Sequence, residues 1–272
     1  MHLFIDRALA RRLERAEGAI STTFSEARAR LAPERGAAWR EMGGAFAIHD
    51  GPDSPMTQAF GLGMSEPTTV AEDIAAIQQF FRERGAATHH EISPLAGVAT
   101  SAMLAERGYR PVELSNVLTR ALDTLAHETA VEGALRARRA LPSEEAAWVE
   151  AAAAGWGAND DGGMREFARM AFLNASMTSF LVELDGAVVG TASLGVHEGI
   201  ALFAGASTVP SARRRGAQRA LFEARVAEAK VRGCEIALMA AEPGSTSQRN
   251  AERNGFRVAY TRTKWKLAHA AV

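Results

Sequence analysis

The stretch T-V-P-S-A-R-R-R-G-A-Q, residues 208–218, decides the fold of the C-terminal half. An extended run ends at Val209, Pro210 stops it, three consecutive arginines follow, and Gly216 opens a helix. The first turn of a helix exposes backbone N–H groups without partners and carries partial positive charge. Glycine lets an anion approach the main chain closely, and arginines add charge-assisted hydrogen bonds. The pattern therefore predicts a phosphate-binding loop between a strand and a helix.

Composition limits the other interpretations of this basic loop. The chain has 272 residues, 47% hydrophobic and 23% charged, which is typical of a globular protein of one large or two ordinary domains. The net charge is −1, from 31 basic and 32 acidic side chains, so the arginines are a local feature and nucleic acid is not the expected partner. A solvated basic turn is the main alternative. Cys234 is the only cysteine, which excludes an intrachain disulfide and a multi-cysteine zinc site.

The N-terminal residues indicate where the protein works. They are charged throughout and contain no apolar core of signal-peptide length. No stretch of the chain approaches the roughly 18 consecutive apolar residues that a membrane span needs. We therefore expect a cytoplasmic protein without membrane contact.

The chain contains an internal repeat. R-G-A-A-T-H-H-E-I (84–92) corresponds to R-G-C-E-I-A-L-M (232–239), and A-E-R-G-Y-R-P-V (105–112) corresponds to A-E-R-N-G-F-R-V (251–258). Gly85 matches Gly233 at an offset of 148, and a single-residue shift separates this match from the second one. Two ordered matches at nearly one offset indicate that the two halves arose by duplication.

Hydrophobic periodicity predicts alternating strands and helices in both halves. For the C-terminal half we expect strands at 135–139, 180–184, 188–194, 200–209, 235–241 and 256–267, with helices at 142–154, 216–232 and 245–253. For the N-terminal half we expect helices at 6–31, 69–84 and 96–107, and strands at 45–49, 57–64, 88–92 and 112–120. The linker is expected at 121–131. This order indicates an α/β fold around mixed sheets.

The C-terminal half resembles the GNAT superfamily of N-acetyltransferases. In that family the coenzyme-A loop follows a strand and has the pattern Gln/Arg-x-x-Gly-x-Gly/Ala. Arg213 and Gly216 match it, whereas Gln218 stands where the family has Gly or Ala. The Gly-Phe after the last helix, here Gly255-Phe256, is a second point of similarity.

The resemblance implies a fold and a set of cofactor contacts. It implies two GNAT-like domains, each a mixed, mainly antiparallel sheet flanked by helices, with a degenerate domain at 1–125 and an acetyltransferase domain at 130–272. Acetyl-CoA would lie where strands 200–209 and 235–241 part, and a backbone N–H near Ser207–Val209 would polarise the thioester carbonyl. The implied cofactor-binding residues are Ser207, Thr208, Val209, Arg213, Arg214, Arg215, Gly216, Ala217, Gln218 and Ser245.

The N-terminal copy has lost the loop. At the offset of 148, residues 65–70 read S-E-P-T-T-V, with neither glycine nor arginine. Thr69 and Glu72 fit a capping box, which would satisfy the helix start without phosphate. We therefore expect this half to bind no acetyl-CoA.

The sequence assigns no catalytic acid or base. Many family members have a tyrosine acid four residues before the glycine of Gly-Phe, and that position is Ala251 here. Ser245, Ser247 and Tyr260 are weak substitutes. Asp160-Asp161 lie where the family places its substrate loop and would suit a cationic amine, although a solvated acidic turn is an equal interpretation.

The expected function is acetyl transfer from acetyl-CoA to an amine, either a small molecule or a peptide, by direct attack on the thioester. The alternative is a non-catalytic CoA-binding regulator or interaction protein. No metal is expected, because His89 and His90 are adjacent on a strand and point to opposite faces. Cys234 is expected to be buried. A homodimer is left open.

Overall fold

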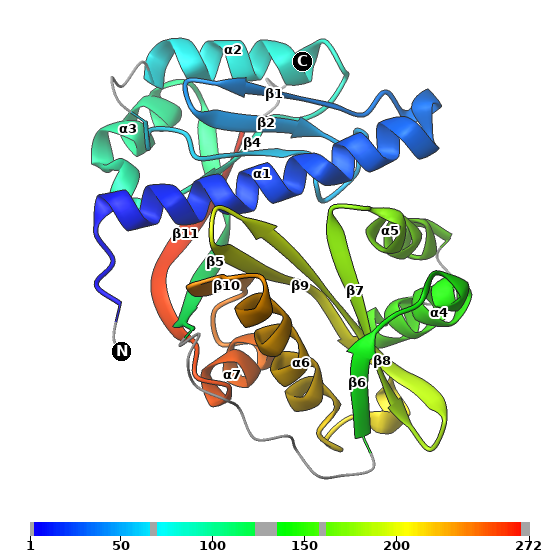
Figure 1. The fold of residues 1–272 in the computed structure, drawn as a ribbon. Coiled ribbons are helices and arrows are strands. Elements are labelled where there is room, and N and C mark those ends of the chain that lie inside the picture. The colour runs from blue at the N-terminus through cyan, green and yellow to red at the C-terminus, as the bar shows by residue number, and fades with distance from the viewer. Residues whose placement is uncertain (1–2, 66–69, 123–134, 158–161, 268–272) are drawn as a thin grey trace. The chain divides into compact units, whose positions relative to one another are not determined.

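The computed structural model describes residues 3–65, 70–122, 135–157 and 162–267. The chain divides into two compact units that do not follow its linear order. The C-terminal unit contains residues 119–239 and 249–257, and the N-terminal unit contains residues 2–118, 240–248 and 258–272. Each unit is a sheet flanked by helices (Figure 1).

The C-terminal unit is built on five neighbouring strands in the order β6–β7–β8–β9–β10. The first four are antiparallel neighbours, and β9 and β10 are parallel. A tight turn at Asp185-Gly186 joins β7 to β8, as the sequence predicts, with both residues at positive φ. The bounds are β6 (Leu135–Arg139), α4 (Glu145–Trp156), α5 (Gly162–Leu173), β7 (Met177–Leu184), β8 (Ala187–His197), β9 (Ile200–Thr208), α6 (Ala217–Val231), β10 (Ile236–Ala241) and α7 (Thr246–Arg253).

Helices α4 and α6 cover opposite faces of this sheet. Ser207 and Thr208 are neighbours at the end of β9, so their side chains point to opposite faces. The Ser207 hydroxyl donates to the Ala151 carbonyl of α4, at 3.4 Å, and the Thr208 hydroxyl accepts from Gln218 of α6, at 2.8 Å. The end of β9 is therefore held from both sides.

The N-terminal unit has the strand order β1–β2–β3–β4–β11–β5. Its bounds are α1 (Arg7–Leu31), β1 (Ala38–Met42), β2 (Ala45–His49), β3 (Gln58–Phe60), α2 (Val70–Arg82), β4 (His89–Ile92), α3 (Val98–Glu106), β5 (Tyr109–Ala121) and β11 (Arg257–Leu267). Strand β11, the last of the chain, pairs antiparallel with β4 from Thr263↔Ile92 to Lys266↔His89. The sequence placed this strand in the C-terminal domain, and the boundary at 125–130 stays a prediction.

The two halves repeat one order of elements, as the internal repeat indicates. The succession β3–α2–β4–α3–β5 corresponds to β9–α6–β10–α7–β11. The sequence missed β1, an edge strand whose three central side chains are exposed, and α5, which begins at a Gly-Gly pair. The predicted linker lies almost wholly outside the described residues.

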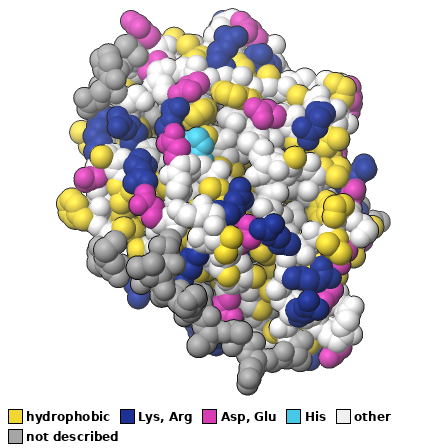
Figure 2. All heavy atoms as spheres, viewed as in Figure 1, with side chains coloured by type: hydrophobic (Ala, Val, Ile, Leu, Met, Phe, Trp, Pro, Cys, Tyr) yellow, Lys and Arg dark blue, Asp and Glu magenta, His cyan; other side chains and the backbone are white. Residues whose placement is uncertain are grey.

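Two surface properties agree with the composition. On the face seen in Figure 2, basic and acidic side chains are interspersed with apolar ones. Within the described part of the chain, no helix is both long and apolar enough to cross a membrane.

A buried charge cluster joins α1 to the sheet of the N-terminal unit. The Arg262 guanidinium donates to Glu17 at 2.8 Å and lies 3.4 Å from Glu14 and 3.6 Å from Glu91. The Tyr260 hydroxyl donates to Glu14 at 2.8 Å. Lys264 pairs with Glu91 at 3.2 Å. Lys264 also pairs with the exposed Glu113 at 3.0 Å, so four carboxylates share two cations, and Arg262 lies closer to Glu17 than to Glu14.

Burial raises the pKa of Glu14 from 4.5 to about 7, with Arg262 opposing the shift and Glu17 adding to it. A carboxyl whose pKa is raised on folding stabilises the fold fully below its unfolded pKa, and this stability is lost as the pH rises through the folded pKa. Glu14→Gln keeps an acceptor for Tyr260 without the charge. We therefore expect the free energy of unfolding of the wild type to fall relative to that of Glu14→Gln between pH about 4.5 and about 7.

Urea unfolding across this pH range measures the difference. The matched control is Glu41→Gln, which removes an exposed carboxylate paired with Arg15 and should leave the pH slope of the wild type unchanged. Parallel curves for the wild type and Glu14→Gln would contradict the assignment.

Candidate functional site

The loop between β9 and α6 has the geometry that its sequence predicts. After β9 ends at Thr208, Pro210–Ala212 form one turn of 3₁₀ helix. Arg214 and Gly216 take positive φ values of 64° and 92°, and α6 begins at Ala217. Gly216 is the N-cap residue and provides no side-chain cap. The first-turn N–H groups of α6 therefore lack the partner that a capping side chain would provide. Gly216 is also exposed, so an anion can reach this helix start from solvent.

Arg213 fixes this loop to the protein. Its Nε donates to the Thr208 carbonyl at 3.3 Å, and its second terminal nitrogen donates to the Gly155 carbonyl at 3.0 Å. It therefore joins the end of β9 to the end of α4. Arg214 and Arg215 are exposed and bring positive charge to the loop. Of the three arginines, Arg213 is thus the one that holds the loop, and its direct contact with cofactor stays a prediction.

Gln218 has an evident structural role. Its side-chain amide donates to the Ser207 carbonyl at 3.0 Å and to the Thr208 hydroxyl at 2.8 Å. A glycine or alanine at this position could make neither bond. The residue that departs from the GNAT pattern therefore ties the first turn of α6 to the end of β9.

The sheet opens beside β9. Strand β8 follows β9 along its whole length, from His197↔Ile200 to Gly190↔Thr208. The parallel ladder with β10 covers only Ile200–Leu202. The part of β9 from Phe203 to Thr208 thus pairs with β8 on one side and lies beyond the end of the ladder with β10 on the other. The predicted parting of these two strands is present.

A β-bulge interrupts β9 within this open part. Thr191 pairs with Ser207 and Ser193 pairs with Ala204, so Ala192 alone faces both Gly205 and Ala206. Gly205 has a positive φ of 61°, a conformation that favours glycine. The bulge also explains why Phe203 and Thr208, five positions apart, both contact α6. Sequence reasoning missed the bulge, although the isolated Gly205 inside a strand was a signal for it.

The end of β9 differs in detail from the expectation. Ser207 is buried, and its hydroxyl lies 2.9 Å from that of Thr191. The Val209 N–H donates to the Val189 carbonyl at 3.0 Å, so it is already used by β8 and cannot also polarise a thioester. Ala217 is buried under the loop. The backbone of the Gly205–Ala206 bulge lies in the same open part of β9 and is out of regular register with β8.

The proton-transfer candidates are mostly committed elsewhere. Ala251, at the position of the family's tyrosine, is fully buried. Tyr260 lies in the N-terminal unit, donates to Glu14, and has its pKa raised well above 10 by burial, so it is a poor acid. The Ser245 hydroxyl caps α7 by accepting from the Gln248 N–H at 3.2 Å, and Ser247 is exposed. Asp160 and Asp161 lie outside the described residues, as does Thr69 of the predicted capping box.

Of the remaining titratable candidates, His90 and Cys234 are core residues. His90 is fully buried against the Tyr109 ring, and burial lowers its pKa to about 3, whereas His89 is only partly buried. Cys234 is buried as predicted, and burial raises its pKa. Among the described residues no group of three or more His, Cys, Asp or Glu could hold a metal ion.

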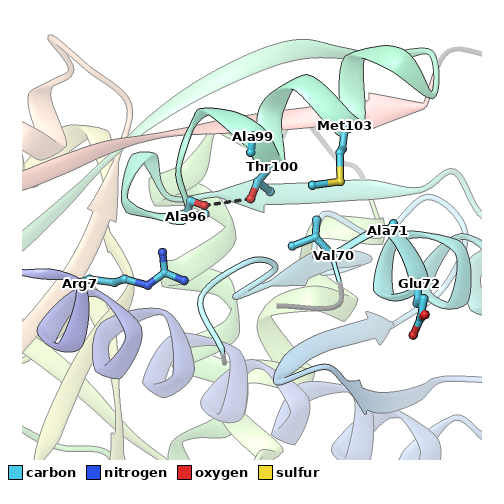
Figure 3. Close-up of a pocket in the computed structure, with 8 residues that line it drawn as sticks. All are labelled: Arg7, Val70, Ala71, Glu72, Ala96, Ala99, Thr100 and Met103. Atoms are coloured by element: carbon cyan, nitrogen blue, oxygen red, sulfur yellow. Dashed lines mark hydrogen bonds between the residues drawn. The ribbon is translucent and has the colours of Figure 1, made fainter. Parts of the chain in front are cut away.

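The N-terminal unit has a cavity of about 450 Å³ (Figure 3). It lies between the starts of α1 and α2 and one side of α3. The described residues that line it include no run of arginines like the one before α6. Arg7 at its edge donates to the carbonyls of Gly63, at 2.9 Å, and Leu95, at 3.3 Å. Thr100 donates to the Ala96 carbonyl. The polar contacts seen here therefore stabilise the unit itself.

Comparisons with known proteins agree with this geometry. Residues 144–256 match the model of the acetyltransferase (GNAT) family. No curated protein matches the sequence. A GCN5-related N-acetyltransferase from Kribbella flavida has a similar structure, with a TM-score of 0.64 and 20% identity over 93% of this chain and 97% of its own.

Two further solved structures share the fold. A GCN5-related N-acetyltransferase from Sphaerobacter thermophilus has a TM-score of 0.56 and 18% identity, over 77% of this chain and 71% of its own. A tandem GNAT protein from the clavulanic acid biosynthesis pathway, solved without acetyl-CoA, has a TM-score of 0.57 and 13% identity, over 96% and 95%. The predicted fold class, two GNAT-like domains with mixed sheets flanked by helices, is confirmed.

The role of Gln218 can be tested by stability. Gln218→Ala removes two hydrogen bonds from the partly buried junction of β9 and α6, so we expect it to lower the free energy of unfolding by about 1–3 kcal/mol. Urea denaturation gives the value. Arg219→Ala, at the next position of the helix, removes only an exposed pair with Glu223 and should cost no more than about 0.5 kcal/mol. Equal losses in the two variants would contradict the anchoring role.

Proposed function

We propose that the protein transfers an acetyl group from acetyl-CoA to an amine, because residues 144–256 match the model of the acetyltransferase (GNAT) family. One observation carries the proposal: the uncapped start of α6, with its arginine loop, directly follows the strand whose β10 side is open. A diphosphate needs the first feature and an extended pantetheine arm needs the second.

In this proposal the diphosphate binds at Gly216. The N–H groups of the first turn of α6 donate to it, and the absence of a side chain at Gly216 allows the close approach. Arg214 and Arg215 neutralise its charge from the exposed side of the loop. Arg213 and Gln218 act indirectly, because their bonds to Thr208, Gly155 and Ser207 keep the loop in this shape before cofactor arrives.

The open edge of β9 holds the pantetheine arm, and the bulge at Gly205–Ala206 faces the acyl carbonyl. The acetyl thioester supplies the acyl group. The amine nitrogen attacks the carbonyl carbon, the C–N bond forms, the C–S bond breaks, the nitrogen loses a proton and the thiolate gains one. A backbone N–H of the bulge stabilises the negative charge that develops on the oxygen. Neither proton transfer is assigned to a side chain.

The proposal also assigns roles to the two domains expected from the sequence. The domain at 130–272 carries the chemistry, and the domain at 1–125, without the loop, binds no acetyl-CoA. The acceptor is a small-molecule or peptide amine, the protein acts in the cytoplasm, and a homodimer is left open.

A CoA-binding regulator is the second candidate, and Ala251 favours it. This buried methyl group occupies the position at which many family members have their acid. The two functions separate in a single set of assays. An enzyme releases thiol from acetyl-CoA in the presence of one or more amines of a panel. A regulator is stabilised by CoA against thermal unfolding and releases no thiol with any amine.

Gly216→Val tests the loop. The new side chain would meet Leu135, whose Cδ1 lies 3.3 Å from the position of a Cβ, and would cover the helix start. We expect stabilisation by acetyl-CoA, measured as a thermal shift, to disappear. The matched control is Gly233→Val at the other end of α6, where φ is likewise positive (72°) and a Cβ would meet nothing within 4 Å. It imposes similar backbone strain and should leave the shift intact. A full shift in Gly216→Val would overturn the loop assignment.

Charge at the loop gives a separate prediction. Replacing both Arg214 and Arg215 by Gln should weaken CoA binding about tenfold or more and reduce its dependence on salt, since two cations near the diphosphate are removed. Isothermal titration at two salt concentrations measures both effects. Arg232→Gln, which removes an exposed cation at the opposite end of α6, serves as the control. An unchanged affinity would place the diphosphate elsewhere.

A further inference from the structure

Helix α4 carries two tryptophans with the same pattern of contacts. The indole N–H of Trp148 donates to the Phe180 carbonyl of β7 at 2.8 Å, and that of Trp156 donates to the Ala206 carbonyl of β9 at 3.3 Å. Each ring also packs on a phenylalanine of α5. Trp148 lies 5.6 Å from Phe172 and Trp156 lies 5.9 Å from Phe167, between ring centroids.

The two tryptophans differ in what their bonds can do. Trp148 is fully buried, and its acceptor Phe180 lies in regular ladders with both Arg139 and Ala192. The orientation of the Phe180 carbonyl is therefore set by the ladders of β7 with both neighbouring strands, independently of Trp148. Trp156 is half-buried, and its acceptor Ala206 lies in the bulge, where the regular pairing with β8 is interrupted. The bond from Trp156 therefore acts where the ladder gives least support.

The ring of Trp156 also lies near the other residue of the bulge, Gly205. A Cβ placed on Gly205 would lie 3.9 Å from the Trp156 ring, which is van der Waals contact. The indole thus lies on the side of Gly205 to which a side chain would point, and its N–H donates to the Ala206 carbonyl. The Ala206 carbonyl belongs to the peptide that joins Ala206 to Ser207, and Ser207 pairs with Thr191 of β8. Because peptides are planar, holding this carbonyl also restricts the next peptide of the bulge, which joins Gly205 to Ala206 and carries the Ala206 N–H.

We propose that Trp156 is a positioning residue that sets the orientation of the bulge peptides in β9, and with them the backbone N–H that contacts the acyl carbonyl. This inference rests on the proposed acetyl transfer. The conformation of the bulge itself can be measured without any turnover. Loss of the indole N–H leaves the bulge in several orientations, of which only a fraction presents its N–H correctly.

Trp156→Phe keeps an aromatic ring beside Phe167 and removes the donor. We expect amide hydrogen exchange at residues 205–207 to become about tenfold faster, and kcat, measured as thiol release with the most active amine of the panel, to fall about tenfold. The KM for acetyl-CoA should stay within about twofold, because the loop at Gly216 is untouched.

Trp148→Phe is the matched control, since it removes an equivalent indole bond from the same helix. It should lower the melting temperature without changing exchange at 205–207 or kcat. If Trp156→Phe does not fold, Gly205→Ala disturbs the bulge from its other residue, through the positive φ of 61°, and should give the same faster exchange and lower kcat.

The possible results are distinct. Equal exchange rates at 205–207 in Trp156→Phe and Trp148→Phe overturn the positioning role. Faster exchange without a fall in kcat also overturns it, because the bulge would then not limit the reaction. If the wild type neither binds CoA nor releases thiol, the proposed function fails, and the exchange data still decide whether Trp156 holds the bulge.

Discussion

The early parting of β9 from β10 is the constraint on which the rest of the C-terminal unit depends. A parallel ladder that ends at Leu202 leaves the second half of β9 paired only to β8. Backbone groups on such an edge need partners, because unpaired N–H and C=O groups are costly when removed from water. The protein satisfies part of this need by itself, because Trp156 donates to the Ala206 carbonyl and Arg213 donates to the Thr208 carbonyl. The remainder is an edge to which an extended ligand can add.

The end of β9 shows how a binding loop can be shaped before its ligand arrives. Gly155 permits close contact, since a Cβ there would lie 2.6 Å from that of Ser207. Arg213 and Gln218 then bind carbonyls at or next to this contact. The side chains of Arg213 and Gln218 hydrogen-bond within the protein, whereas those of Arg214 and Arg215 are exposed. A loop held in this way loses little conformational entropy on binding an anion, which favours affinity.

The N-terminal unit reaches its stability by a different arrangement. The last strand of the chain, β11, pairs with β4 and brings Arg262 and Tyr260 to the carboxylates of α1. A buried cluster of this kind contributes little net stability unless every charge is paired. Here the excess carboxyl, Glu14, can keep its proton near neutral pH. The corresponding sequence in α1 gave no sign of burial, because its charged residues are typical of a solvated helix.

The sequence by itself determined the order of elements apart from β1 and α5, the internal repeat and the loop at Arg213–Gly216. Each of these depends on local chemistry: hydrophobic periodicity, helix starts and glycine at positive φ. It could not determine the bulge at Gly205–Ala206, the partner of β11 or the bonds of Gln218. Those depend on which segments meet across the sheet, and residues distant in the sequence supply the partners. Gln218 shows the difference most clearly. In the sequence it breaks a pattern, and in the structure its two hydrogen bonds hold the helix start against the strand.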